Sequence, residues 1–197
     1  MFTFKRGLRR GALAVVIAFA ASTGAGQAAN MPSLVGPPNL SLASSLIASG
    51  GGPGSFSSVR AFDAMIGPDA LLSAENQLAA SYGDAGASQF VSTFDFAIAD
   101  AWKLAGQNDL RMPPATQTGG QALATDLVRA GTDRSGTFRS AQLFITLLGP
   151  SVAAQLMNDI DQRYGPGSAT AFDRIANQFF YDVAQTVGTN VSLAPNH

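Results

Sequence analysis

An internal repeat constrains the fold of this chain more than any other feature of its sequence. The segment 56–106 aligns without a gap on 138–188, at a constant offset of 82 positions. A single gap extends the alignment backwards, so that 42–50 meets 123–131. The identical pairs are Phe56/Phe138, Ser58/Ser140, Phe62/Phe144, Gly67/Gly149, Pro68/Pro150, Asn76/Asn158, Tyr82/Tyr164, Gly83/Gly165, Ala87/Ala169, Phe90/Phe172, Asp100/Asp182, Gly106/Gly188, Leu42/Leu123, Ala43/Ala124, Leu46/Leu127 and Gly50/Gly131. Because aromatic and turn residues dominate the match, we interpret the chain as a tandem duplication.

The sequence of each copy predicts four helices. Apolar residues recur three or four positions apart, which places them on one helical face. Gly-Pro pairs predict a tight corner between the second and third helices, because Gly lets the chain turn and Pro is accepted at the first helical position. The expected helices cover 42–49, 56–66, 68–82 and 88–106 in the first copy, with Ser88 as an N-cap, and 123–130, 138–148, 150–164 and 168–188 in the second.

The predicted fold class is all-α. No segment alternates apolar and polar residues for long enough to indicate a strand. A unit of about 65 residues has a marginal core by itself. We therefore expect the two four-helix units to pack on each other as one pseudo-symmetric helical domain.

The first 28 residues resemble a secretory signal peptide. Four basic residues precede an unbroken run of small and apolar residues at 11–21, and Ala28 suits the position before a cleavage site. The run is shorter than the roughly 20 residues that cross a bilayer, so no membrane anchor is expected after cleavage. Leu8 stands where a twin-arginine signal carries a polar residue, which favours ordinary Sec export to the periplasm or beyond the cell.

The remaining organisation follows from the repeat and from Pro and Gly clusters. We expect a loosely ordered mature N-terminus, two repeats, a linker and a short tail. These segments are 29–41, repeat 1 at 42–106, the linker at 107–122, repeat 2 at 123–188 and the tail at 189–197.

The composition excludes several classes of function. The formal net charge is −1, and cleavage of the leader removes four basic residues and no acidic one, so the mature chain is acidic and unsuited to nucleic acid. The chain has no Cys, and its one His is the terminal His197, which argues against Ser-His-acid triads and His-based zinc sites. We expect no catalytic residues, no cofactor and no metal.

Two groups of residues are candidates for a binding site. The first is a symmetric polar set at matched positions of the two repeats, formed by Asn76, Asn158, Asp100 and Asp182. The simpler interpretation of that set is local, with each side chain satisfying a backbone group in its own copy. The second group is an apolar pocket or partner surface formed by Trp102, Phe179, Phe180 and Tyr181. The simpler interpretation of these rings is burial in the core.

These observations favour binding over catalysis. We expect an exported, non-enzymatic interaction or structural protein of the bacterial envelope, which binds a protein partner or assembles with its own copies. The alternative is a periplasmic binder of a small apolar ligand held between the two repeats.

Overall fold

The computed structural model describes residues 36–116 and 118–193, and these residues are mostly helical. This confirms the all-α prediction. The predicted signal peptide at 1–28, the start of the mature chain and His197 lie outside the described residues. The elements are α1 (Leu40–Ser49), α2 (Ser58–Ile66), α3 (Pro68–Gln107), α4 (Gly120–Gly131), β1 (Thr137–Phe138), α5 (Ser140–Leu148), α6 (Pro150–Tyr164), α7 (Ser168–Thr186) and β2 (Ser192–Leu193).

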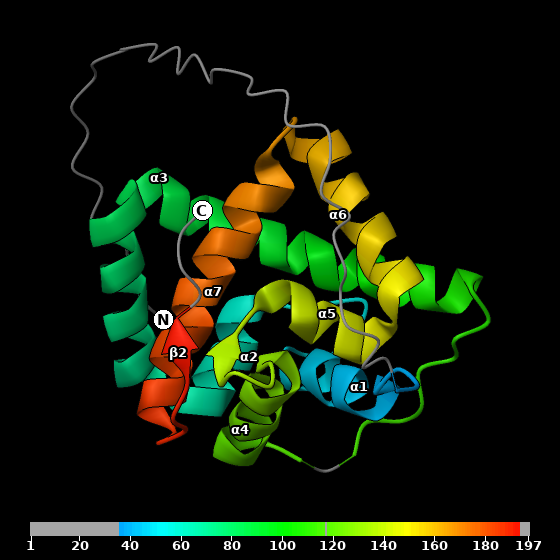
Figure 1. Cartoon of the computed structure of the whole chain (residues 1–197), viewed down its shortest axis with the longest axis horizontal. Helices are drawn as coiled ribbons and strands as arrows, with labels where there is room; N and C mark the ends of the chain where they lie inside the picture. The colour runs from blue at the N-terminus through cyan, green and yellow to red at the C-terminus, as the bar shows by residue number, and fades with distance from the viewer. Residues whose placement is uncertain (1–35, 117, 194–197) are drawn as a thin grey trace. The chain divides into compact units, whose positions relative to one another are not determined.

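The span α3 consists of two helices that meet at a kink at Gly83, where the sequence predicts the end of one helix. Gly83 breaks the helical geometry with φ 77° and ψ 161°, and the helix resumes at once. Ser88 therefore lies inside α3 and caps no helix, which corrects the sequence prediction. We call 68–82 the first arm of α3 and 84–107 its second arm. Figure 1 shows the two arms running in different directions, with α7 beside the first arm.

The equivalent junction in the second half separates α6 from α7. Gly165 and Gly167 both adopt positive φ, at 104° and 87°, and Pro166 stands between them. Proline has no backbone N–H to give to a helix. The two helices of α3 therefore meet at a single Gly without a loop, whereas Gly-Pro-Gly forms a short turn between α6 and α7.

Both Gly-Pro corners form as predicted. Gly67 has φ 82° and ψ 162°, and Gly149 has φ 85° and ψ 158°. Residues that have a Cβ rarely adopt these backbone conformations. Pro68 and Pro150 follow at the start of the next helix. The corners set the direction in which α3 leaves α2 and α6 leaves α5.

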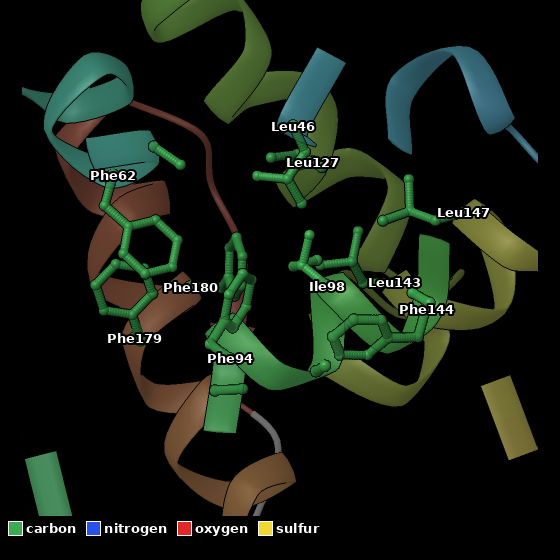
Figure 2. Close-up of a cluster of buried hydrophobic side chains, with 14 of the residues drawn as sticks. Leu46, Phe62, Phe94, Ile98, Leu127, Leu143, Phe144, Leu147, Phe179 and Phe180 are labelled. Atoms are coloured by element: carbon green, nitrogen blue, oxygen red, sulfur yellow. The ribbon is translucent and has the colours of Figure 1, made fainter. Parts of the chain in front are cut away.

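Phenylalanine rings from four helices form the centre of the core. Phe62, Phe94, Phe144, Phe179 and Phe180 are each at most 1% exposed. The rings of Phe62 and Phe179 lie 4.2 Å apart between centroids, in a tilted arrangement. Figure 2 shows these rings converging from α2, α3, α5 and α7, with leucines of α1, α4 and α5 beside them. The core therefore contains side chains from both segments, 42–106 and 123–188.

Side chains from distant helices cap the starts of α2 and α5. The backbone N–H of Ser58 donates to Asp95 Oδ1 at 2.6 Å, and that of Ser140 donates to Asn177 Oδ1 at 2.6 Å. The Ala141 N–H donates to Asp173 Oδ1 at 3.1 Å. These bonds satisfy helix-terminal N–H groups that have no partner within the helix, and they tie α2 to α3 and α5 to α7.

Two further features complete the fold. The segment between α3 and α4 lies against α1, where Ser45 Oγ donates to the Thr116 carbonyl at 3.1 Å. Strands β1 and β2 pair in parallel over two residues each, and the sequence does not predict them. None of the helices described in the structure is long and apolar enough to cross a membrane.

Candidate functional site: a polar cleft between helices α3 and α7

A cleft of ≈ 440 Å³ opens between the first arm of α3 and the C-terminal half of α7. We call it the α3–α7 cleft. It lies between the segments 42–106 and 123–188, which the sequence predicts to be the two repeats. Two alanines of α3, Ala70 and Ala74, contribute to its wall. The polar side chains around it are Ser73, Gln77, Tyr181, Asp182, Gln185 and Thr186.

The helical spacing of small and large residues explains why space remains there. Leu71 and Leu78 of the first arm are buried and hold the arm against the domain. Ala70 and Ala74 lie four positions apart, so they share one face of the helix. Because their side chains are single methyl groups, they leave room opposite α7 where longer side chains would fill it.

Asp182 is the only ionisable carboxyl group among the residues that line the cleft. Its Oδ1 accepts a hydrogen bond from Gln178 Nε2 at 3.0 Å, whereas its Oδ2 is buried without any hydrogen-bond partner. Burial raises the pKa of Asp182, and the bond from Gln178 partly opposes that rise. A buried polar oxygen without a partner is rare in folded proteins and costs free energy.

No basic side chain compensates this carboxyl group in the part of the chain that the structure describes. The ion pairs found there join Arg129 to Asp126 and Arg139 to Asp133. Neither pair involves α3 or α7. The cleft therefore contains one carboxyl group surrounded by neutral hydroxyl and amide groups.

Asp100, at the matched position 82 residues earlier, has a different neighbour. It lies on the second arm of α3 and faces Asp159 of α6. Burial raises the pKa of Asp100, a hydrogen bond to Asp159 and the Asp159 charge raise it further, and Lys103 opposes the rise. A hydrogen bond between two carboxyl groups requires a proton on one of them. Asp100 Oδ2 is buried without a hydrogen-bond partner among the described residues.

The structure separates the four polar residues that the repeat singles out. Asp182 lies in the cleft, and Asp100 lies at the contact between α3 and α6. Asn76 and Asn158 are exposed on α3 and α6. The four side chains are thus not gathered into one site, and Asp182 alone belongs to a cleft.

The four aromatic residues are also separated. Phe179 and Phe180 are buried in the core, at 1% and 0% exposure. Tyr181 lines the α3–α7 cleft, and Trp102 is 36% exposed on the second arm of α3. A second cavity, lined by apolar side chains, measures ≈ 10 Å³, which is about the space of one water molecule.

The sequence prediction includes Tyr181 and Asp182 but not the other polar residues of the cleft, which are Ser73, Gln77, Gln185 and Thr186. Gln178, Asp182 and Gln185 follow one another at spacings of four and three on α7, which places them in a polar stripe along one face of the helix. Ser73 and Gln77 form a matching pair four positions apart on α3. These two stripes were the available signal, although only the packing of α3 on α7 brings them together.

Comparison with known proteins gives no relative from which a function could be transferred. No family model matches the chain, and neither the curated proteins nor the solved structures contain a match. The chemistry of the cleft is therefore the basis for assigning a function.

Proposed function

We propose that this chain is an exported, non-enzymatic helical protein that binds a small polar molecule in the α3–α7 cleft. The observation that carries the proposal is the Asp182 carboxyl group, because Asp182 lines a cleft of ≈ 440 Å³ and its buried Oδ2 has no hydrogen-bond partner among the described residues. A bound molecule that donates a hydrogen bond would find an acceptor in this carboxyl group. Clefts of this volume lie within the usual range for small-molecule sites.

The lining favours a polar ligand over the apolar one considered from the sequence. Six of the eight lining residues carry a polar group. An apolar molecule in this cleft would remove those groups from water without replacing their hydrogen bonds, which is costly. The apolar cavity of ≈ 10 Å³ is too small for a ligand.

The lining also favours binding over catalysis. Ser73, Tyr181 and Thr186 carry the hydroxyl groups of the cleft, and the lining residues include no His, Cys or Lys. A hydroxyl nucleophile needs an adjacent base to remove its proton. The proposal of export rests on the leader-like segment 1–28.

We also propose that the cleft is a product of tandem duplication. Several contacts of the first segment recur at positions 82 residues later. Ser58 and Asp95 correspond in this way to Ser140 and Asn177, and both backbone N–H groups donate at 2.6 Å. The Gly67 and Gly149 corners have nearly equal backbone angles.

The contacts between the two segments support a pseudo-two-fold arrangement. The matched residues Phe90 and Phe172 stack on each other, with ring centroids 5.8 Å apart and an interplanar angle of 26°. Tyr82 lies under Arg174, with 5.5 Å between the guanidinium carbon and the ring centroid. Tyr164 donates from its hydroxyl to the carbonyl of Ser92, the residue that matches Arg174. Reciprocal contacts of this kind are typical of two-fold interfaces.

Native mass spectrometry tests the binding function. The full chain would be produced with its leader in a bacterial host and purified from the exported fraction. We expect a retained small mass that is lost on denaturation. Ala70→Leu fills the cleft and should abolish the retained mass, whereas Ala80→Leu, on an exposed part of the same arm, should keep it. Retention that is equal in both variants would contradict the proposed site.

A second candidate function is binding of a protein partner or self-assembly. It is favoured by two large apolar side chains exposed on α3, Leu72 at 57% and Trp102 at 36%. The same spectra distinguish this function from the first. Masses at multiples of the chain, or a co-purifying protein, that disappear in a Leu72→Ser, Trp102→Ser double variant would support it.

A further inference from the structure

We infer that the ligand of the α3–α7 cleft carries a positively charged nitrogen, which sits against the Asp182 carboxyl group. This inference rests on the proposed binding function and names the chemical class of the ligand. The class meant is a small organic ammonium compound.

The first argument is charge. Asp182 is the one charged side chain that lines the cleft, and the ion pairs within the described ranges lie elsewhere. An anionic ligand would be repelled by Asp182 and would meet no basic group. A neutral donor could satisfy Oδ2, but hydrogen bonds between a cationic donor and a carboxylate are roughly twice as strong as neutral ones.

The second argument is the supply of hydrogen-bond acceptors. An ammonium group has N–H donors and no acceptor, so it needs several oxygen atoms around it. Thr186 Oγ1 donates its own hydrogen to the Asp182 carbonyl at 3.0 Å, which leaves its lone pairs available. Gln77 Nε2 donates to Ser73 Oγ at 3.5 Å, which leaves the Gln77 carbonyl oxygen available. These acceptors belong to residues that line the cleft together with Asp182.

The third argument is the contrast with the matched position in the other half. Asp100 corresponds to Asp182, and Asp159 corresponds to Gln77. On the α6 side, burial and the second acid Asp159, which lies beside Asp100, raise the pKa of Asp100, although Asp100 Oδ2, like Asp182 Oδ2, has no hydrogen-bond partner among the described residues. In the cleft, the amide of Gln77 stands in place of that second acid. The cleft therefore keeps a carboxyl group that a cation from solution can neutralise.

Titration with small probes, followed by NMR of the aspartate side-chain carbons, tests the inference. The probes are methylammonium and tetramethylammonium chloride, acetamide as a neutral probe and sodium acetate as an anion, all at one ionic strength and neutral pH. We expect saturable shifts of the Asp182 carboxyl carbon with methylammonium, weaker shifts with tetramethylammonium because it has no N–H to donate, and none with acetate. Asp182→Asn should weaken methylammonium binding roughly tenfold or more. Asp100→Asn, the matched control outside the cleft, should leave it unchanged.

The outcomes separate the ligand class from the binding function. If acetamide binds as tightly as methylammonium, or if Asp182→Asn binds as well as the parent protein, the ligand class is wrong while the cleft remains a binding site. If Ala70→Leu binds methylammonium as tightly as the parent, the cation sits elsewhere and the inference fails. If no probe shifts any cleft residue, the inference and the proposed function both fail. Circular dichroism of each variant shows that it is folded.

Discussion

Replacing Gly131 by Ala should destabilise the protein through one contact in the core. A Cβ at this position would lie 2.3 Å from Cε2, 2.8 Å from Cζ and 2.9 Å from Cδ2 of Phe138, all shorter than van der Waals contact. The Phe138 ring is 0% exposed and stacks on Phe180 at 5.2 Å, so it has no free space to occupy. Overpacking of this kind costs about 1–3 kcal/mol.

Gly50, the matched glycine of the first segment, gives a comparison for this loss of stability. A Cβ at Gly50 would meet the ring of Phe56 at 2.4 Å, but Phe56 is only partly buried and can turn toward solvent. We therefore expect Gly50→Ala to cost less than Gly131→Ala. Gly106 has no atom within 4 Å of an added Cβ, so Gly106→Ala should stabilise α3 by about 0.5 kcal/mol.

Urea unfolding followed by circular dichroism measures all three variants. The expected order of midpoints is Gly106→Ala highest, then the parent protein, then Gly50→Ala, with Gly131→Ala lowest and with equal slopes. A Gly131→Ala protein as stable as Gly50→Ala would refute the reasoning. It would mean that the ring of Phe138 has room to move.

Three further predictions concern helix capping and pH. Asn177→Ala leaves the buried N–H of Ser140 without its acceptor and should lower the free energy of unfolding by about 1–3 kcal/mol. Asp95→Ala should have the same effect at the start of α2. Urea midpoints measure both variants, and unchanged midpoints would show that these bonds contribute nothing to stability. The pKa of Asp100 is raised, so the folded protein holds this proton more tightly than the unfolded chain does. The contribution of Asp100 to stability is therefore complete below pH 3.8 and is lost as pH rises through the raised pKa. Asp100→Asn should flatten that loss in unfolding curves taken from about pH 4 to neutral. Hydrogen bonds from Ser135 and Thr137 lower the pKa of Asp133 to about 2. The contribution of Asp133 to stability is therefore present above pH 3.8 and disappears as pH falls toward 2. Asp133→Asn should remove that part of the loss of stability in acid, and an unchanged dependence of stability on acid pH would contradict the prediction.

The helices and corners were predictable because their signals are local. Gly-Pro pairs and apolar residues at helical spacing lie within a few positions of the structure they determine. The absence of a loop at Gly83 was not predictable in the same way, because a glycine can end one helix and begin the next directly. Only the packing of both arms decides between a bend and a connection.

The glycines at the ends of α1 and α4 show a second limit. A glycine directly after an apolar helix predicts a residue with positive φ that ends the helix. However, Gly50 has φ −85° and Gly131 is not among the positive-φ glycines. Each instead allows a Phe side chain from the following segment to approach closely. That requirement is tertiary, and the helix sequence contains no sign of it.

The candidate site was predictable only in part. The repeat singled out Asp182 as a polar residue kept in both halves, because polar side chains on an apolar helix are conspicuous. Its environment depends on which helix lies opposite, and that is set by the bend in α3. The acid pair of Asp100 and Asp159 likewise joins residues far apart in sequence, and helical spacing by itself does not relate them.

Because the chain bends at Gly83, a small rotation at this residue moves the whole first arm of α3. At a rise of about 1.5 Å per residue, the arm extends roughly 22 Å from its pivot, and Ala70, Ser73, Ala74 and Gln77 lie along its far two-thirds. A rotation of about 5° at the pivot would displace these residues by about 1–2 Å at that rise. The width of the cleft therefore depends in part on two backbone torsions at a residue that does not line it. A substitution at Gly83, where φ is 77°, would alter that width without removing any group that lines the cleft.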